Sequence, residues 1–332
     1  IPHGELAAEI AHAIIQAFAE PFPLDGTPLS LTSSIGISIF PDDGEQVEAL
    51  IGHADRAMYA AKGEGRNTFR FFNPRMHFAA SRRVQEENDL RRAFEQGHLE
   101  LHYQPRRRIE SGKIVAVEAL LRWRHPERGL LPAASFMRLA EETGLAIPMG
   151  EWVIVTACRQ LAAWQRSGTS ARIGVNLSRK QFLHPQLEAI ATAALRNAGV
   201  DPGCLELEVA EETVMENAGR SAERLRRLGE IGVRISVDEF GTGRSSLPWL
   251  KRLPIRSVKV DRAFVSDIGA DEASAVIQAV IDLSHRLRLE VVAQGVETEA
   301  QLTFLANHGC DEAQGRYIGA PVPARELAPF LT

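Results

Sequence analysis

Residues 233–250 read VRISVDEFGTGRSSLPWL, an apolar strand pattern that runs into two acids and a glycine-rich turn. Apolar side chains occupy every second position from Val233 to Val237, as in a short buried strand. The strand ends at Asp238 and Glu239, which repel each other and lose solvation there, so a cation would stabilise them. The same residues are also typical of a solvated turn, and the pair alone leaves both interpretations open.

The chain from residue 98 onward alternates strand patterns with helical stretches. The strand patterns are LELHYQPRRRI, KIVAVEALLRW, RIGVNLS, LELEVAEE, RISVDEF, SVKVDRAF, LEVVAQGVE and EAQGRYIG. Only Glu110, Ser111 and Gly112 separate the first two, which is too short for a parallel crossover, so the first strand should be antiparallel. Eight strands with intervening helices predict an α/β fold, a (β/α)8 TIM-like barrel. An open doubly wound sheet is the alternative, but no GxGxxG follows a first strand to support it.

Six of these strand patterns end in a polar side chain at the same relative height. The residues are Glu118, Asn176, Glu208, Asp238 with Glu239, Lys259 and Glu297. Reactive groups of such barrels lie at the C-terminal ends of the strands. A set rich in oxygen, without sulfur and poor in histidine, suits Mg²⁺ or Mn²⁺, which favours a metal site over a turn for the acid pair. For Lys259, an ion pair with Asp261 is the structural alternative to a catalytic role.

Composition limits the class of protein. The 332 residues, 45% of them hydrophobic, can bury a core of about two domains, or a barrel with an appendage. The net charge of -5 argues against a nucleic-acid polymer as partner. The three cysteines show no CxxC spacing, and no apolar run reaches the ~20 residues of a membrane span. We therefore expect a cytoplasmic protein, or the cytoplasmic part of a membrane-anchored one.

The first 72 residues predict a smaller α/β piece. Its expected elements are an apolar helix over 7–19, a half-buried strand over SLTSSIGISIF at 30–40 and an amphipathic helix over 47–61. The motifs SSIGIS, PDDG and ADRAMYAAKGEGRN resemble the C-terminal half of a GGDEF (diguanylate cyclase) domain, without the GGDEF motif itself. The resemblance implies a partial α/β domain over 1–72 that cannot cyclise GTP. Residues 73–97, polar with apolar positions at helical spacing, predict a linker helix.

The segment VEALLRW at 117–123 resembles the signature of EAL-type cyclic di-GMP phosphodiesterases. YQP before it and VNLS, LELEVAEE, FGTGRSSL, GVET and GCDEAQG after it stand in that family's order, and the resemblance assigns residues 98–332 to its barrel. The resemblance implies hydrolysis of one phosphodiester of cyclic di-GMP to linear pGpG in a two-metal site. It also implies an upstream regulatory or sensory domain and a homodimer formed through the EAL domain.

The resemblance further implies roles for single residues. The ligands of the first metal would be Glu118, Asn176, Glu208 and Asp238, and the second metal would share Asp238 and add Glu239 and Glu297. Two ions would acidify a bridging water, and Lys259 would hold or deprotonate that water, so Lys259 and Glu297 have catalytic roles. The substrate contacts would be Gln104, Arg122 and Gln314. Glu211 would brace the FGTG loop, which couples metal binding to the dimer interface.

This sequence departs from the family's pattern at three positions. Glu239 stands where the family commonly has Asp, Ala210 where it has Thr, and Gln294 where it has Glu. The extra methylene of Glu239 moves the carboxylate by about one C–C bond and puts the second metal in doubt. A catalytically inactive cyclic di-GMP receptor is therefore the alternative function. A third reading, a metal lyase or isomerase, does not explain the ordered motifs.

Three consecutive arginines, Arg106, Arg107 and Arg108, close the first strand pattern. Such a run could attract phosphate. A charged strand end is also typical of a solvated edge, and the sequence favours that reading.

Overall fold

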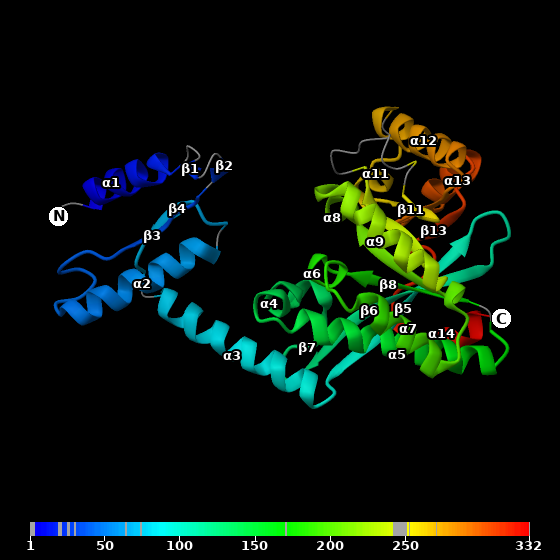
Figure 1. The fold of residues 1–332 in the computed structure, drawn as a ribbon, viewed down its shortest axis with the longest axis horizontal. Helices are drawn as coiled ribbons and strands as arrows, with labels where there is room; N and C mark the ends of the chain where they lie inside the picture. The colour runs from blue at the N-terminus through cyan, green and yellow to red at the C-terminus, as the bar shows by residue number, and fades with distance from the viewer. Residues whose placement is uncertain are drawn as a thin grey trace. The chain divides into compact units, whose positions relative to one another are not determined.

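The computed structural model describes residues 4–18, 22–24, 27–29, 31–63, 65–73, 75–169, 171–241, 251, 253–269 and 271–331. The chain divides into two compact units, residues 1–89 and 90–332, and each is described by itself (Figure 1). Helix α3, Arg75–Glu95, contains the boundary between them. The sequence-based domain limits at 72 and 97 stay a prediction.

Among its described residues, the first unit contains two small sheets, the helices α1 and α2, and the first part of α3. Its elements are α1 Gly4–Ala17, β1 Phe22–Leu24, β2 Thr27–Leu29, β3 Ser34–Ile37, α2 Val47–Gly63 and β4 Thr68–Phe71. Strands β1 and β2 pair antiparallel, whereas β3 and β4 pair parallel in a separate sheet. The half-buried strand expected over 30–40 is present as β3, but it is shorter than the run and covers Ser34–Ile37. Residue 30 lies outside the described residues.

Helix α2 lies very close to β3, and a glycine makes this approach possible. A Cβ atom at Gly36 would lie 1.8 Å from the carbonyl oxygen of Ala54 and 2.2 Å from the amide nitrogen of Met58. Ala57 and Ala61, on the same helix, are completely buried. Small side chains on both elements therefore let the two backbones touch.

The second unit is a closed barrel of eight strands. They are β5 Leu99–Arg108, β6 Ile114–His125, β8 Arg172–Leu177, β9 Leu205–Ala210, β10 Arg234–Phe240, β11 Ser257–Val260, β12 Glu290–Ala293 and β13 Glu312–Gln314. Strand β5 pairs antiparallel with both β6 and β13, while the other neighbouring strands pair parallel. The predicted barrel with an antiparallel first strand is thus confirmed.

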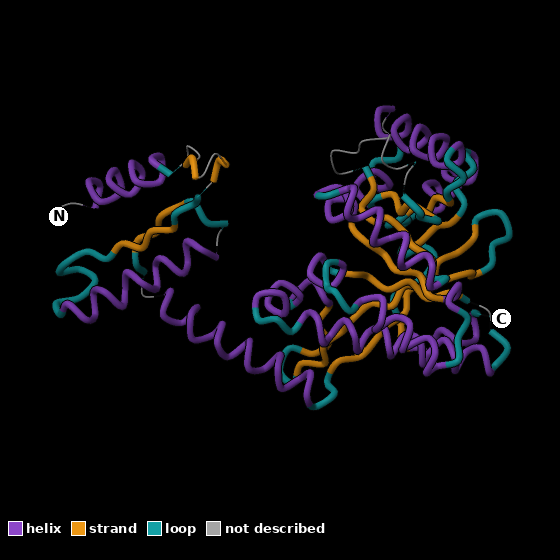
Figure 2. The backbone as a smooth tube through the Cα atoms, in the orientation of Figure 1, coloured by secondary structure: helices purple, strands orange, loops and turns teal. Residues whose placement is uncertain are grey.

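Helices between the strands cover the outside of the barrel (Figures 1 and 2). They are α4 Met137–Glu142, α5 Ala146–Arg166, α6 Arg179–Phe182, α7 Leu187–Ala198, α8 Glu211–Glu216, α9 Ala218–Ile231, α11 Arg262–Ser266, α12 Asp271–Arg286, α13 Glu299–Asn307 and α14 Ala324–Leu327. Two short strands, β7 Gly129–Pro132 and β14 Val322–Pro323, extend the sheet beside β6 and β5. The helices bury apolar stripes against the strands, as in α5, where Ile154, Ala157 and Leu161 are inaccessible or nearly so.

Strand β9 presents apolar side chains on one face and acidic ones on the other. In β9, Leu205, Leu207 and Val209 alternate with Glu206 and Glu208, and all five side chains are buried. Successive side chains of a strand point to opposite faces, so the two glutamates share one face. Glu206 pairs with Arg106 of β5, and because β6 and β8 separate β5 from β9 in the ring, this contact crosses the interior. The barrel interior is therefore charged.

The packing of Gly36 predicts that Gly36→Ala destabilises the first unit by roughly 1–3 kcal/mol or more, because the new methyl group meets backbone atoms that cannot turn away. Amide hydrogen exchange in α2 and β3 measures the loss. Gly52→Ala is the control, since nothing lies within 4 Å of its Cβ position, and it should stabilise α2 by up to about 1 kcal/mol. Equal protection in both variants would contradict this packing.

Candidate functional site

A buried ammonium group lies where several strands bring their polar residues together. Lys259 of β11 is completely buried, and its Nζ donates to Glu118 Oε2 of β6 at 2.9 Å and to Glu208 Oε2 of β9 at 2.5 Å. Asp238 Oδ2 of β10 lies 3.6 Å from the same nitrogen. Asn176 of β8 donates from Nδ2 to Glu118 Oε1 at 2.6 Å. Five strands thus place five predicted site residues in one cluster.

Asp261, the alternative partner considered for Lys259, caps a helix. The carboxylate of Asp261 accepts a hydrogen bond from the Ala263 amide at 2.8 Å and caps the start of α11. The ion pairs that Lys259 makes with described residues join it to Glu118, Glu208 and Asp238. These described ion pairs differ from the alternative weighed for the sequence, an ion pair between Lys259 and Asp261.

Negative charge exceeds positive charge in this cluster. Burial lowers the pKa of Lys259, but Asp238, Glu118 and Glu208 outweigh it and hold that pKa well above its usual range. Burial raises the pKa of Glu208 to about 8, with Lys259 opposing and Glu118 and Asp238 reinforcing the shift. Burial also raises the pKa of Asp238, against the attraction of Lys259. Three carboxylates therefore share one ammonium, an arrangement that a further cation would stabilise.

Two glutamines extend the cluster to the antiparallel strand. Gln314 of β13 donates from Nε2 to Glu118 Oε2 at 2.7 Å and to Gln104 Oε1 of β5 at 3.1 Å. Gln104 in turn donates to the carbonyl oxygen of Gly319 at 3.1 Å. Arg122 is half-buried on β6, on the same face as Glu118, and burial lowers its pKa against the attraction of that carboxylate. These predicted substrate residues surround the same carboxylate.

Two predicted residues lie outside the cluster. Glu297 is exposed, and its carboxylate lies 3.8 Å from Arg262, a residue of α11. Glu239 is also exposed, with a positive φ of 55° that is uncommon for a residue other than glycine, and its amide donates to Asp238 Oδ1 at 2.8 Å. Burial of part of its side chain and the nearby Asp238 raise the pKa of Glu239.

Glu211, the first residue of α8, is buried and contacts the start of the FGTG loop. Its Oε2 accepts a hydrogen bond from the Gly241 amide at 3.0 Å. Residues 242–250, which contain the rest of that loop, lie outside the described residues. The bracing role of Glu211 stays a prediction.

The donor set has the chemistry of a site for a hard divalent cation. Glu118, Glu208, Asp238 and Asn176 offer oxygen atoms, the ligands that Mg²⁺ and Mn²⁺ prefer. Glu208 Oε1 is buried and has no hydrogen-bond partner among the described residues. In the part of the chain that the structure describes, no three His, Cys, Asp or Glu side chains are arranged to hold a metal, because the carboxylates converge on Lys259 instead.

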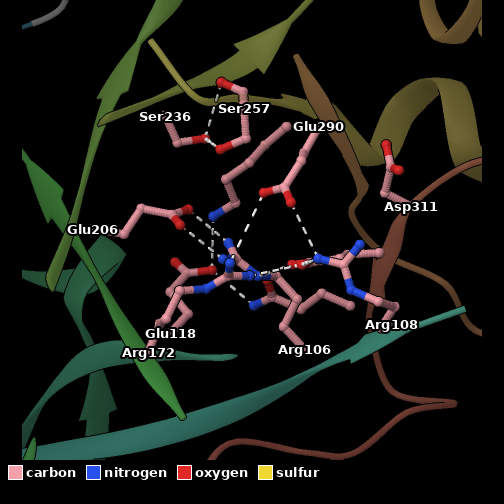
Figure 3. Close-up of polar contacts among 12 residues, drawn as sticks. Arg106, Arg108, Glu118, Arg172, Glu206, Ser236, Ser257, Glu290 and Asp311 are labelled. Carbon is pink, nitrogen blue, oxygen red and sulfur yellow. Dashed lines mark hydrogen bonds and ion pairs between the residues drawn. The ribbon is translucent and has the colours of Figure 1, made fainter. Parts of the chain in front are cut away.

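A layer of ion pairs lies in the barrel beside this cluster, and little in the sequence points to it. Its members are Arg106, Arg108, Arg172, Arg234, Glu206, Glu290 and Glu312. Arg106, Arg108, Arg172 and Glu206 point toward one another in the interior (Figure 3). Arg106 is 2% exposed, so the solvated edge favoured for the arginine run does not describe this residue. The alternation of β5 could have indicated this, because Arg106 shares its strand face with Gln104.

The fold and the cluster define a class, the (β/α)8-type barrels with one inverted strand and an acidic interior at the strand ends. The family model "EAL domain" matches residues 87–321, and the chain belongs to that family. The model "Diguanylate cyclase, GGDEF domain" matches residues 2–68. Both predicted resemblances are thus confirmed.

Characterised relatives resemble nearly the whole chain. The bifunctional diguanylate cyclase/cyclic di-GMP phosphodiesterase MucR of Pseudomonas aeruginosa is 43% identical over 97% of this chain and 47% of its own length. The cyclic di-GMP phosphodiesterase NbdA of the same organism is 40% identical over 97% of this chain and 41% of its own. The chain therefore spans less than half the length of these relatives.

A solved structure of the PaMucR phosphodiesterase in a c-di-GMP complex superimposes on this fold. It is 45% identical, covers 73% of this chain and 99% of its own, and has a TM-score of 0.72.

Among the described residues, none of the helices has the length and apolar character needed to cross a membrane.

The charge balance predicts that Lys259→Met destabilises the barrel by about 3–5 kcal/mol in a buffer with chelator, because it leaves buried carboxylates without their cation. The double variant Lys259→Met/Glu208→Gln should recover part of this loss. Urea unfolding measures both, with the exposed Lys113→Met as control. A double variant as unstable as the single one would contradict the charge account.

Proposed function

We propose that this chain hydrolyses one phosphodiester bond of cyclic di-GMP and releases linear pGpG. The observation that carries the proposal is the convergence of Glu118, Asn176, Glu208 and Asp238 on Lys259 inside the barrel. Membership of the EAL family supports the substrate, as do relatives named as cyclic di-GMP phosphodiesterases. The enzyme would accordingly be a hydrolase of phosphodiester bonds in second-messenger signalling.

The same residues would hold Mg²⁺ or Mn²⁺. Glu118, Asn176, Glu208 and Asp238 would bind the first ion, and Asp238, Glu239 and Glu297 the second. The excess of buried carboxylates supports a cation at this place, as does Oε1 of Glu208, which accepts no hydrogen bond from the described residues. When bound, two ions acidify a water molecule and neutralise charge on the attacked phosphate.

The remaining residues would position the substrate and the water. Lys259 would hold the attacking water and screen the charge that develops on the phosphate. Arg122 offers a fork of donors suited to a phosphate group. Gln104 and Gln314 are linked to each other and to Glu118, so a substrate bound to their amides would be held beside the acids. Glu211 would keep the loop that begins at Gly241 in place.

The assembly around this barrel is part of the same proposal. Residues 1–72 would be a partial GGDEF-like domain, residues 73–97 a linker helix and residues 98–332 the phosphodiesterase barrel. The chain would act in the cytoplasm, under an upstream regulatory or sensory domain, as a homodimer formed through the EAL domain. The family matches over 2–68 and 87–321 support this division.

A second candidate is a receptor that binds cyclic di-GMP without turnover. The geometry of two residues favours it: Glu239 is exposed at a positive φ, and Glu297 pairs with Arg262 away from the cluster. Neither contacts Lys259 through an ion pair in the described part of the chain. A site with only the first ion would still hold the phosphate but would lack half of its activating charge.

The proposal predicts conversion of cyclic di-GMP to pGpG in the presence of Mg²⁺ or Mn²⁺. Glu118→Gln should lower kcat/KM by about 100-fold or more, because residues that only support a metal ligand already cost 10–100-fold. Chromatography of the nucleotides measures the reaction. The control is Glu110→Gln, an exposed glutamate in the turn between β5 and β6, which should keep wild-type turnover.

Two outcomes would decide against the enzyme. Binding of cyclic di-GMP without pGpG, with either ion, would favour the receptor. Wild-type turnover in Glu118→Gln would show that the reaction does not use this cluster.

A further inference from the structure

Arg106 is a buried cation that contacts the cluster from the side opposite to Lys259. Its guanidinium binds Glu206 through two hydrogen bonds of 2.8 and 2.9 Å and lies 2.7 Å from Glu312 Oε2. Its Nη1 atom is also 3.6 Å from Glu208 Oε1. The side chains of Arg106, Glu206 and Glu208 are at most 3% exposed, so solvent does not screen these contacts.

The direction of β5 places this arginine. Because β5 runs antiparallel to the other barrel strands, residues that follow Gln104 lie deeper in the barrel rather than beyond its mouth. Arg106 points to the same face as Gln104, two residues on. On β9, Glu206 and Glu208 also share one face, and the guanidinium of Arg106 contacts both. Arg106 therefore joins the ion-pair layer to the candidate site.

The two oxygen atoms of Glu208 have different surroundings. Oε2 accepts the hydrogen bond from Lys259, whereas Oε1 lies against the backbone of β8 at Gly174. A Cβ atom at Gly174 would lie only 2.2 Å from Oε1. The carboxylate thus has Lys259, Gly174 and Arg106 as neighbours.

We propose that Arg106 is a positioning residue that orients the carboxylate of Glu208 for binding a divalent cation. The inference rests on the proposed function, in which Glu208 is a metal ligand. Glu206 of β9 and Glu312 of β13 hold the guanidinium of Arg106 in place. Because the guanidinium cannot move with Glu208, it gives that carboxylate a fixed partner. Without Arg106, Glu208 would lose the positive group beside Oε1 and turn away from the common site.

The experiment measures Mn²⁺ affinity directly, from the electron paramagnetic resonance signal of free Mn²⁺ during titration of the whole 332-residue chain. Arg106→Met should weaken Mn²⁺ binding by about 10-fold or more. Loss of a nearby positive charge alone would strengthen the binding of a cation, so the two explanations predict opposite signs. Tighter or unchanged binding in Arg106→Met would overturn the proposal.

Arg234→Met is the matched control. Arg234 belongs to the same layer and pairs with Glu206 and Glu290, but no ion pair joins it to Glu208 among the described residues. Its replacement removes the same charge and should change Mn²⁺ affinity by less than about twofold, even where it lowers the melting temperature. Equal weakening in Arg234→Met and Arg106→Met would also overturn the proposal, because the effect would then belong to the whole layer.

Arg106→Met leaves Glu206 without its main partner and could unfold the barrel. The double variant Arg106→Met/Glu206→Gln removes the pair together, keeps the net charge and should bind Mn²⁺ as weakly as the single variant. Wild-type affinity in this folded double variant would overturn the proposal.

Glu208→Gln distinguishes a failure of this inference from a failure of the proposed function. If Glu208→Gln weakens Mn²⁺ binding and the Arg106 variants do not, only the positioning role is wrong. If Glu208→Gln binds Mn²⁺ like the wild type, Glu208 is not a ligand and both proposals fail.

Discussion

The ammonium of Lys259, buried among three carboxylates, is the interaction on which the site depends. Glu118, Glu208 and Asp238 come from three different strands, and their mutual repulsion at this largely buried place would be severe without a cation between them. Lys259 supplies one positive charge. Burial raises the pKa values of Glu208 and Asp238, and the neighbouring carboxylates add to the shift against the attraction of Lys259. The barrel thus holds an unbalanced charge that suits a divalent ion.

The reversed direction of β5 explains how the buried Arg106 comes to lie beside Glu208 of the site. A parallel first strand would carry its last residues to the mouth, whereas β5 carries Arg106 into the interior. There Arg106 meets glutamates from β9 and β13, and an ion-pair layer occupies space that apolar side chains usually fill in barrels of this type. Breaking such buried pairs singly is costly, so the layer holds its members in fixed positions.

Much of this architecture follows from the sequence. The three-residue connection at 110–112 ruled out a parallel crossover, and the strand-end acids were expected to converge because parallel strands end at one face of a barrel. The ion-pair layer could not be predicted in the same way. Arg106 and Glu206 are 100 residues apart, and a run of arginines shows nothing of its partners until the strands are arranged in a ring. Likewise, Lys259 pairs across the barrel rather than with its neighbour Asp261, which caps a helix.

Anomalous diffraction from crystals of this chain grown with Mn²⁺ tests the central claim most directly. The account predicts an anomalous peak within coordination distance of Glu118, Asn176, Glu208 and Asp238, with the carboxylates turned from Lys259 toward the ion. Peaks confined to exposed carboxylates, with all three acids still bound to the Lys259 ammonium, would contradict it.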